Sequence, residues 1–433
     1  MGAHARVLAG RAVLTRRVRD PAPGSLVGRY LVLGLALGRH IEGLVDAYYG
    51  PEALVRRASA GPLADPAQLV AEARSVIGGI DAGEPLDAPG GEERLATGGA
   101  EGTSELQARR RRWLRAQVLG LLTTARRLAG ERVGYEEEVE GCYGVRPRFV
   151  PEEEILAAHG LLAEALPGNG PLGERLIAWR ERHAVAPDVL PAVVRSVEDE
   201  LRARTERLFG LPEGEQVDVG LVTGKPWSGF NTYLGGLRSK VEVNTDLPVL
   251  STSLGHLVAH EAYPGHHSEH CRKEVRLVRS MGFVEETAFF VGTPECLVSE
   301  GLADLGIEVA IGPRPEPVLA EIFHAHGLSY DPEVVAVVAE AGEALGSVRS
   351  NAAWRLHAEG AGVDEVTDEV ARLGLLPAKR ATKAVEFLVH PTWRAYVTCY
   401  TEGLALCRGF VGGDPARFER LLSEQLTPAD LSG

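Results

Sequence analysis

The chain has 433 residues, of which 45% are hydrophobic and 24% are charged, and its formal net charge is −14 at pH 7. These proportions are those of an ordinary soluble globular protein that is long enough for two or three folding units. The excess of 60 acidic over 46 basic residues argues against a nucleic-acid partner, which would need a basic face.

The N-terminal residues 1–24 are expected to form a disordered tail, because they are rich in arginine and lack the uninterrupted apolar stretch of a secretory signal. The longest apolar run, LVLGLALG at 31–38, is too short to span a bilayer, so no membrane partner is predicted. Five cysteines without C-x-x-C spacing favour reduced thiols, and hence a cytoplasmic location, over a disulfide scaffold.

The first half of the chain carries apolar residues at helical spacing, which predicts an N-terminal helical lobe over 25–215. Asp65, directly before Pro66, is predicted to cap one of its helices. A stretch rich in Gly, Pro and Ala predicts a long loop at 82–104, and the run RRRRW at 109–113 is interpreted as a solvated face. The predicted helices cover 25–50, 66–80, 105–131, 151–165, 171–184 and 187–209.

Alternating valines with Gly, Asn and Asp between them predict strands and a hairpin within 215–248, from EQVDVGLVTG to SKVEVNTDLP. A helix should follow over 251–263, and the remainder of the chain is mostly helical in pattern. The predicted fold is therefore mainly α, with a small sheet before a catalytic helical lobe that covers 216–433.

The stretch VAHEAYPGHHSEHC at 258–271 holds four histidines and two glutamates in fourteen residues. It begins like the zinc-protease pattern H-E-x-x-H, with His260 and Glu261, but Pro264 stands where the second histidine is needed. Proline has no N–H, and its ring clashes with the carbonyl four residues back. The helix should therefore stop just before the proline.

A chain corner after this helix could still place a second imidazole beside His260. Gly265 can adopt the positive φ that would turn the chain, and His266 and His267 would then open the next helix. A catalytic zinc ion needs three protein ligands and an open position for water, with a carboxylate nearby to accept the proton of that water. Glu261, next to a candidate ligand, is the natural base.

A third ligand should come from a separate helix, and CLVSEGLADLGIE offers one. Glu300 and Asp304 are four residues apart on one helix face, so Glu300 could bind the metal while Asp304 accepts a hydrogen bond from a ligand histidine. His256 and His270 are rival ligands, which we interpret as packing or surface residues. A di-iron site would need Glu-x-x-His on two helices, and the sequence has only EIFH at 321–324.

These residues resemble a known family. HEAYPGHH resembles the His-Glu-x-x-Pro-Gly-His-His signature of the bacterial domain-of-unknown-function 885 family, a group similar to zinc metallopeptidases. SEGLAD resembles the family's Glu-Gly-Trp-Ala segment, with Leu302 in place of tryptophan, and SKVEVNTDLP looks like the family's approach to its site. HPTWRAYVTCYTEGLALCRG is similar to its Pro-Gly-Gln-Ala-x-x-Tyr-x-x-Gly segment, although the glycine and glutamine are absent. The motifs cover roughly 216–410, and DAYYGP is a looser likeness in the N-terminal half.

The resemblance implies a gluzincin-type peptidase fold with a cleft between two helical lobes. It also implies that His260, His266 and Glu300 bind the metal and that Glu261 is the catalytic base, with His267 as the alternative to His266. One zinc ion per chain is the expected cofactor, and another divalent ion is the alternative.

The C-terminal segment offers groups that could stabilise the oxyanion formed during amide hydrolysis. Tyr396, Tyr400 and Arg394 lie in this segment, and packing is an equally open role for each. Asn244 could end a strand and point into the cleft to bind substrate, or it could cap the turn before Pro248.

The sequence therefore predicts a zinc-dependent hydrolase, with a metallopeptidase that acts on peptides or small amides as the first hypothesis. A metal-dependent amidase or esterase would need the same ligands and base. A helical binding protein without activity is the alternative of another class, and it predicts no metal. The sequence leaves the oligomeric state open.

Overall fold

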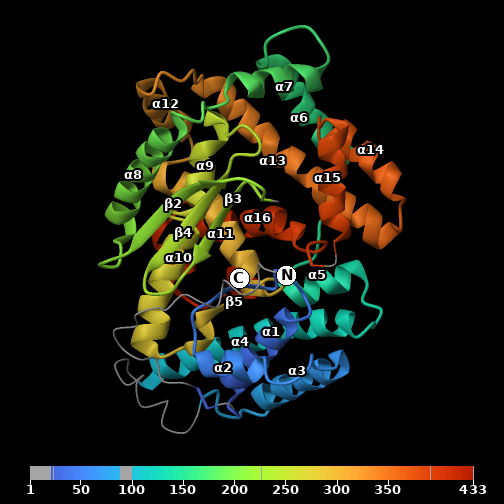
Figure 1. Ribbon diagram of the computed structural model, residues 1–433, viewed down its shortest axis with the longest axis vertical. Helices are drawn as coiled ribbons and strands as arrows, with labels where there is room; N and C mark the ends of the chain where they lie inside the picture. The colour runs from blue at the N-terminus through green and yellow to red at the C-terminus, as the bar shows by residue number, and fades with distance from the viewer. Residues whose placement is uncertain (1–20, 23, 88–99, 226, 391, 433) are drawn as a thin grey trace.

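The computed structural model describes residues 21–22, 24–87, 100–225, 227–390 and 392–432 (Figure 1). Its architecture is mainly helical, as the sequence predicts, and it contains two small sheets. The early helices α1 to α4 lie together at one end of the molecule, and the three-stranded sheet lies beside α9 and α10 towards the other end (Figure 1). No helix within the described ranges is long and apolar enough to cross a membrane.

The helices are α1 (Leu26–Gly38), α2 (Glu52–Ala58), α3 (Pro66–Asp81), α4 (Ala100–Leu128), α5 (Tyr135–Tyr143), α6 (Glu152–Ala165), α7 (Leu172–Arg182), α8 (Leu190–Phe209), α9 (Ser251–Glu261), α10 (His266–Lys273), α11 (Pro294–Ile311), α12 (Glu316–Ala325), α13 (Pro332–Trp354), α14 (Val363–Leu373), α15 (Ala378–Val389), α16 (Leu404–Val411), α17 (Pro415–Ser423) and α18 (Pro428–Leu431). Wider or tighter helical turns form η3 (Glu274–Met281), η4 (Val284–Thr287), η5 (Arg355–Glu359) and η6 (Cys399–Gly403).

The predicted strands form a three-stranded sheet in the order β2-β4-β3. β3 (Gly229–Tyr233) and β4 (Arg238–Asn244) pair antiparallel as the expected hairpin, and β2 (Gln216–Val222) pairs parallel with β4. A second sheet, which the sequence analysis did not predict, pairs β1 (Val45–Tyr48) antiparallel with β5 (Ala288–Phe290).

The single helix predicted over 25–50 is wrong beyond Gly38, where α1 ends. Gly43 adopts a φ of 81°, a left-handed conformation that breaks a helix, and the chain then enters β1. Valine and aromatic residues in this stretch pack equally well in a strand once a partner strand is present. That partner, β5, lies more than 240 residues later in the chain, so the local pattern could not reveal it.

Asp65 caps α3 as predicted, because its carboxylate accepts a hydrogen bond from the N–H of Ala67. The predicted loop at 82–104 is too long at its C-terminal end, because α4 begins at Ala100, and residues 88–99 of that loop lie outside the described residues. Residues 1–20 and 23 of the predicted tail also lie outside the described residues.

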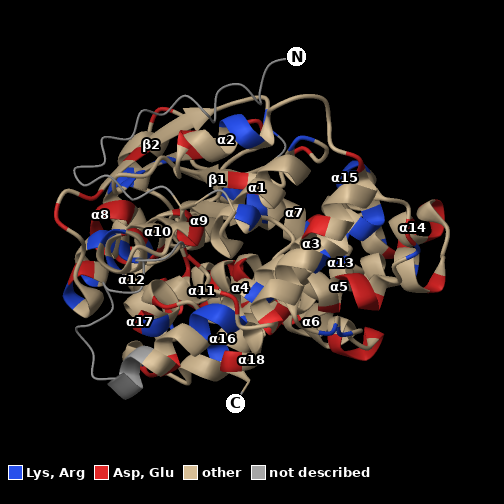
Figure 2. Cartoon of the chain, turned by 90° about the horizontal axis from the view of Figure 1, so that it is seen from below, with Lys and Arg blue, Asp and Glu red and all other residues tan. Residues whose placement is uncertain are grey.

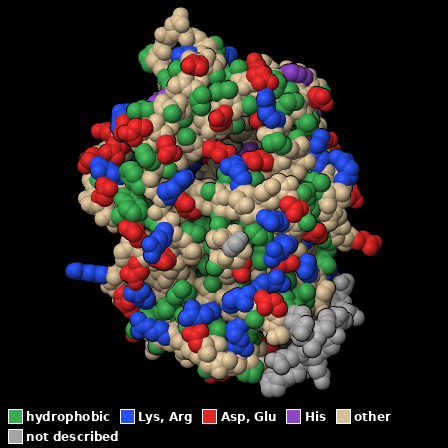
Figure 3. Space-filling model, turned by 180° about the vertical axis from the view of Figure 1, so that it is seen from behind, with side chains coloured by type: hydrophobic (Ala, Val, Ile, Leu, Met, Phe, Trp, Pro, Cys, Tyr) green, Lys and Arg blue, Asp and Glu red, His purple; other side chains and the backbone are tan. Residues whose placement is uncertain are grey.

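The interpretation of the arginine run at 109–113 as a solvated face is wrong for Arg110. Its guanidinium is 2% exposed and forms ion pairs with Glu285 and Asp87. Trp113 is fully buried in the cluster that α1, α3 and α4 share. Basic and acidic side chains are interspersed over the chain and over the back face of the molecule (Figures 2 and 3).

Helix α11 is buried on nearly every side, as expected for a helix whose apolar residues surround its axis. It packs against α9, α16, α17 and η6. One hydrophobic cluster joins side chains of α6 to α8 with side chains of α9, α11, α12 and α13. The boundary between two lobes at 215 and 216 stays a prediction.

Candidate metal centre

The corner between α9 and α10 brings the candidate ligands together. α9 ends at Glu261, Pro264 follows, and α10 begins at His266, as the sequence predicts. The role predicted for Gly265 is wrong, because its φ is −73°. A Cβ atom at this position would lie 2.0 Å from the carbonyl oxygen of His260. Gly265 is therefore needed for the close approach of the two helix ends.

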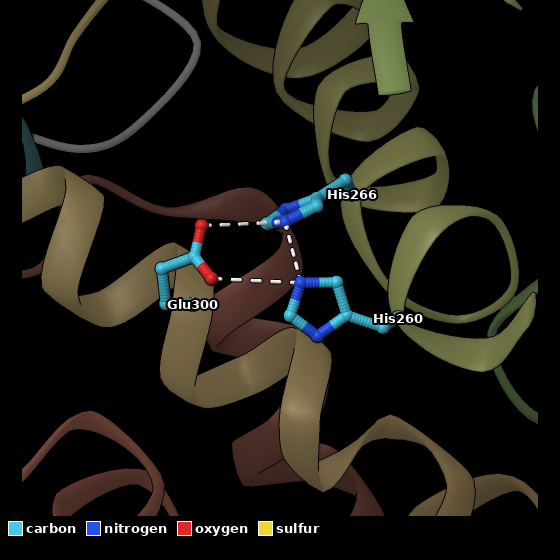
Figure 4. A group of neighbouring side chains, drawn as sticks. All are labelled: His260, His266 and Glu300. Carbon is cyan, nitrogen blue, oxygen red and sulfur yellow. Dashed lines mark hydrogen bonds and ion pairs between the residues drawn. The ribbon is translucent and has the colours of Figure 1, made fainter. Parts of the chain in front are cut away.

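Three donor atoms meet at this corner, on His260, His266 and Glu300 (Figure 4). The two Nε2 atoms of the histidines are 3.1 Å apart. The Glu300 oxygens lie 3.5 Å from Nε2 of His260 and 3.6 Å from Nε2 of His266. In a tetrahedral zinc site, with zinc–nitrogen distances of about 2.0–2.1 Å, neighbouring ligand atoms lie about 3.3 Å apart. The spacing of the three atoms therefore fits one zinc ion.

The outer nitrogen of each ring has its own partner. Nδ1 of His260 lies 2.8 Å from the carboxylate of Asp304, and Nδ1 of His266 lies 3.2 Å from Oγ of Ser299. Burial raises the pKa of Asp304, but the hydrogen bond and charge of His260 outweigh it, so this pKa is lowered and the group is ionised. An ionised carboxylate only accepts, so Nδ1 of His260 carries the proton. Its Nε2 then presents a lone pair to the centre of the site.

The side chains of Glu300 and His260 face each other in a way that favours a bound cation. The buried Oε2 of Glu300 has no hydrogen-bond partner among the described residues. It faces the Nε2 lone pair of His260, and two acceptors repel each other unless positive charge lies between them. Burial lowers the pKa of His260, but Asp304 and Glu300 raise it more, so that without a metal ion a proton on Nε2 would occupy the place between His260 and Glu300. The site thus favours positive charge, and a metal ion bound by His260, His266 and Glu300 would supply it.

Glu261 lies beside these ligands and is 7% exposed. Burial, more than the neighbouring charges, raises the pKa of its carboxyl group. Its carboxyl group forms no ion pair among the described residues, and a hydrogen bond from the backbone of Asn231 acts to lower its pKa. Its backbone carbonyl accepts a hydrogen bond from the side-chain amide of Asn231. A Cβ atom on Gly229 would lie 3.2 Å from its Oε1, so strand β3 closes over this carboxylate.

The structure brings both predicted tyrosines to the site. The Tyr396 hydroxyl donates to Oε1 of Glu300 at 2.9 Å, and the Tyr400 hydroxyl donates to the Tyr396 oxygen at 3.4 Å. Burial, followed by the negative charge of Glu300, raises the pKa of both tyrosines well above its usual value. Both hydroxyls are therefore protonated donors at neutral pH.

The alternative prediction, that His267 binds the metal in place of His266, is wrong. Its ring is fully buried on the other side of α10, where Nε2 lies 2.8 Å from Glu215 and Nδ1 lies 2.8 Å from Ser239. Successive helical residues point about 100° apart, so only one of the two adjacent histidines can face the site. Burial would raise the pKa of Glu215, but hydrogen bonds from His267, Tyr263 and Arg202 lower it to about 2.

Two further predicted residues lie elsewhere. The Arg394 guanidinium forms an ion pair with Glu138, whose side chain is 2% exposed, so it joins the C-terminal segment to α5 and is not free to bind an oxyanion. The Asn244 amide donates to the carbonyl oxygens of Lys225 and Trp227, both at 2.9 Å, so it holds the loop before β3. The substrate-binding role of Asn244 is therefore replaced by a structural one.

The rival histidines do not join the metal group. Nε2 of His256 lies 3.5 Å from Asp304 on the partly exposed side of α9. His270 stacks on Tyr233, and burial lowers its pKa to about 3. In the EIFH segment, Nε2 of His324 pairs with the carbonyl of Tyr330.

Three further residues near the ligands were not predicted from the sequence: Asp46, Ser299 and Glu269. Asp46 lies at the irregularity between Val45 and Ala47 in β1, and such bulges re-aim a side chain. Its pKa is raised to about 7, mainly by burial and also by the charges of Glu300 and Glu261, while the charge of His266 acts to lower it. Asp46 is therefore within electrostatic reach of the metal ligands. Its only local signal was the stretch DAYYGP, which reads as the end of a helix.

No family model and no curated protein matches the chain. The fold resembles the crystal structure of a candidate lipoprotein from Colwellia psychrerythraea, with a TM-score of 0.51 and 17% identity, over 84% of this chain and 69% of that one. A structure of a candidate lipoprotein of unknown function from Shewanella oneidensis has a TM-score of 0.45 and 13% identity, over 93% of this chain and 81% of that one. These likenesses concern the fold alone, and the resemblance to the domain-of-unknown-function 885 family stays a prediction.

Proposed function

We propose that the protein is a zinc-dependent hydrolase, with peptides as the substrate class. The observation that supports this proposal best is the group formed by His260, His266 and Glu300, whose ligand atoms all lie within 4.8 Å of one another. Two nitrogens and one carboxylate leave one position of a tetrahedral zinc ion open, which is the arrangement of catalytic zinc sites. A bound zinc ion would supply Lewis acidity, which acidifies a water ligand and polarises a carbonyl group.

Glu261 would act as the general base. It is adjacent in sequence to a ligand, and its carboxylate forms no ion pair among the described residues that would hold it away from the attacking water. The same group would then pass this proton to the leaving amine. Its raised pKa brings it closer to the pH at which a carboxyl group both accepts and donates.

Tyr396 would stabilise the negative charge that develops on the carbonyl oxygen. Its hydroxyl donates to Oε1 of Glu300 and would turn from that oxygen to the substrate oxygen, while the Tyr400 hydroxyl donates to it at 3.4 Å. A donor that is already oriented in a buried site stabilises such a charge more than water does. Arg394 has no part in this step, because its guanidinium is engaged by Glu138.

The proposed function is tested with Glu261→Gln, which keeps the size of the side chain and removes the base. Peptide mixtures and amide and ester reporters are incubated with the zinc-loaded wild type and variant, and the products are identified by mass spectrometry. We expect peptide cleavage to fall about 10²–10⁴-fold in the variant. The matched control is Glu321→Gln, on the exposed face of α12, which should retain full activity.

Cleavage that survives in Glu261→Gln at full zinc occupancy would contradict the proposed base. Turnover of ester or simple amide reporters without peptide cleavage would keep the zinc chemistry and assign the protein to the amidase or esterase class. A wild type that binds no zinc and cleaves nothing would leave the helical binding protein as the better explanation.

A cytoplasmic location is part of this proposal. All five cysteines are unpaired and buried, at Cys142, Cys271, Cys296, Cys399 and Cys407, which fits a reducing compartment. Fractionation of cells that express the full-length gene checks this directly, and recovery in the membrane fraction would contradict it.

A further inference from the structure

The buried side of His266 is covered by a row of polar side chains that the proposed mechanism does not use. Oγ of Ser299 lies 3.2 Å from Nδ1 of His266 and donates to Oε2 of Glu269. The other oxygen of Glu269 lies 2.8 Å from Nζ of Lys273. Ser299 is fully buried, Glu269 is 1% exposed and Lys273 is 6% exposed, so water does not compete for these groups.

The charged groups of Glu269 and Lys273 determine the direction of the hydrogen bonds in this row. The ion pair with Lys273 keeps Glu269 ionised, and an ionised carboxylate only accepts, so Glu269 accepts the hydrogen bond from Ser299. The single proton of the Ser299 hydroxyl is then committed to Glu269. Its oxygen must accept the proton on Nδ1 of His266, which leaves a lone pair on Nε2 at the centre of the site.

Lys273 also connects the two helices that carry ligands. Its Nζ lies 2.8 Å from Oε1 of Glu295, in the first turn of α11, and α11 carries both Ser299 and Glu300. Lys273 and Glu269 themselves belong to α10, which carries His266. The row therefore couples the orientation of His266 on α10 to the position of α11, which carries Glu300.

We infer that Ser299 and Glu269 are positioning residues that fix the orientation and proton-bearing nitrogen of His266, and thereby set the affinity of the site for its metal ion. The inference rests on the metal site of the proposed function. It makes the two histidines unequal, because His260 is held by one direct carboxylate, Asp304, while His266 is held through a hydroxyl.

Glu269→Gln tests the inference because it should reverse the direction of the hydrogen bonds that Ser299 makes with residue 269 and with His266. The ammonium group of Lys273 repels an NH₂ group at this distance, so the new amide would turn its oxygen to Lys273 and its NH₂ group to Ser299. The Ser299 hydroxyl would then donate to Nδ1 of His266, which places the ring proton on Nε2, where the metal should bind. Glu295→Gln is the matched control, because it removes a buried carboxylate at the same distance from Lys273 that makes no hydrogen bond to Ser299 among the described residues.

The zinc dissociation constants of wild type, Glu269→Gln and Glu295→Gln are measured by competition with a chelating dye, and the melting temperature of each zinc-free protein reports its stability. We expect Glu269→Gln to bind zinc about 10–100-fold more weakly than Glu295→Gln. If either variant fails to fold, Ser299→Ala is compared with Ser268→Ala. Ser268 is also fully buried in α10, and its hydroxyl donates to the carbonyl of Ala262.

Equal zinc affinities within each matched pair, beside a wild type that binds zinc, would overturn this inference and leave the proposed function intact. A wild type that binds no zinc would overturn both.

Discussion

His266 and His267 are neighbours in the chain with opposite environments. One faces His260 and Glu300, and the other is fully buried against Glu215 and Ser239. The helix geometry permits only one of them to face the site, but the residue at which α10 begins decides which one. That start is set by the contact of Gly265 with the end of α9, so the sequence pattern left two alternatives open.

The half-buried Glu215 should make a measurable contribution to acid stability. Its pKa of about 2 lies below the ordinary value, so its stabilising effect is present above about pH 4.5 and is lost as the pH falls towards 2. A shift of this size corresponds to an upper bound of about 3 kcal/mol, which solvent screening of the half-buried group reduces. In Glu215→Gln, the difference in unfolding free energy from wild type should shrink by most of that amount between pH 6 and pH 3, as measured by urea unfolding. The exposed Glu213→Gln is the control, and a difference that stays constant with pH would contradict the assignment.

Tyr396 is expected to affect turnover more than metal binding. Tyr396→Phe removes the donor beside Glu300 but keeps the ring and its packing against Trp393 and Tyr400. Removal of one oxyanion donor typically lowers kcat about 10²–10³-fold. This prediction rests on the proposed hydrolase, and kcat, KM and zinc content are measured together. Loss of zinc with unchanged kcat per bound metal would show that the hydroxyl only holds Glu300.

Residues with local signals were predictable and residues with distant partners were not. The adjacency of His260 and Glu261 and the four-residue spacing of Glu300 and Asp304 are helical patterns, and the structure keeps each pair as expected. Arg394 lies in the predicted segment, but its partner Glu138 is 256 positions away in the chain. Nothing in the C-terminal segment could reveal that pairing.

The α9–α10 corner shows how an element boundary shapes the site. Pro264 ends α9 as its chemistry requires, and the return of the chain depends on a residue without a side chain at position 265. The positive φ expected of Gly265 was the wrong reason for a correct position, because glycine also permits close backbone contacts.

Gly265→Ala should destabilise the protein and weaken the metal site together. The added methyl group would lie 2.0 Å from the His260 carbonyl and 2.5 Å from that of Ala259, so α9 and α10 must separate. Overpacking of this kind costs roughly 1–3 kcal/mol or more. Gly78→Ala in α3 is the control, since a Cβ there meets nothing within 4 Å, and it should stabilise the helix by up to about 1 kcal/mol. Urea unfolding and zinc titration check both variants, and equal behaviour would contradict the role given to Gly265.

Strand β1 is an element that the local periodicity of the sequence could not predict. Its residues continue an apolar helical pattern, and only pairing with β5 makes them a strand. That pairing brings Asp46 into electrostatic reach of the ligands from the opposite half of the chain. The three-stranded sheet was predictable, because its alternation and its turn residues lie within one continuous stretch.

At the scale of the whole molecule, α11 lies at the centre of the architecture. It carries Glu300, Ser299 and Asp304, and it packs against α9 and against the C-terminal helices. The fold class followed from periodicity, while the central position of α11 depends on clusters that combine residues from distant segments. Because these hydrophobic clusters hold α9 and α11, the helical fold should persist when metal is removed.

The measurement that tests the central claim most directly is the zinc content of the purified protein, with His260→Ala as the control. Elemental analysis is made after zinc loading and removal of unbound metal, with circular dichroism to confirm that both proteins are folded. The account predicts about one zinc ion per chain in the wild type and its loss in His260→Ala, without loss of helix. A folded wild type that retains no metal would contradict the zinc centre and the hydrolase proposal that depends on it.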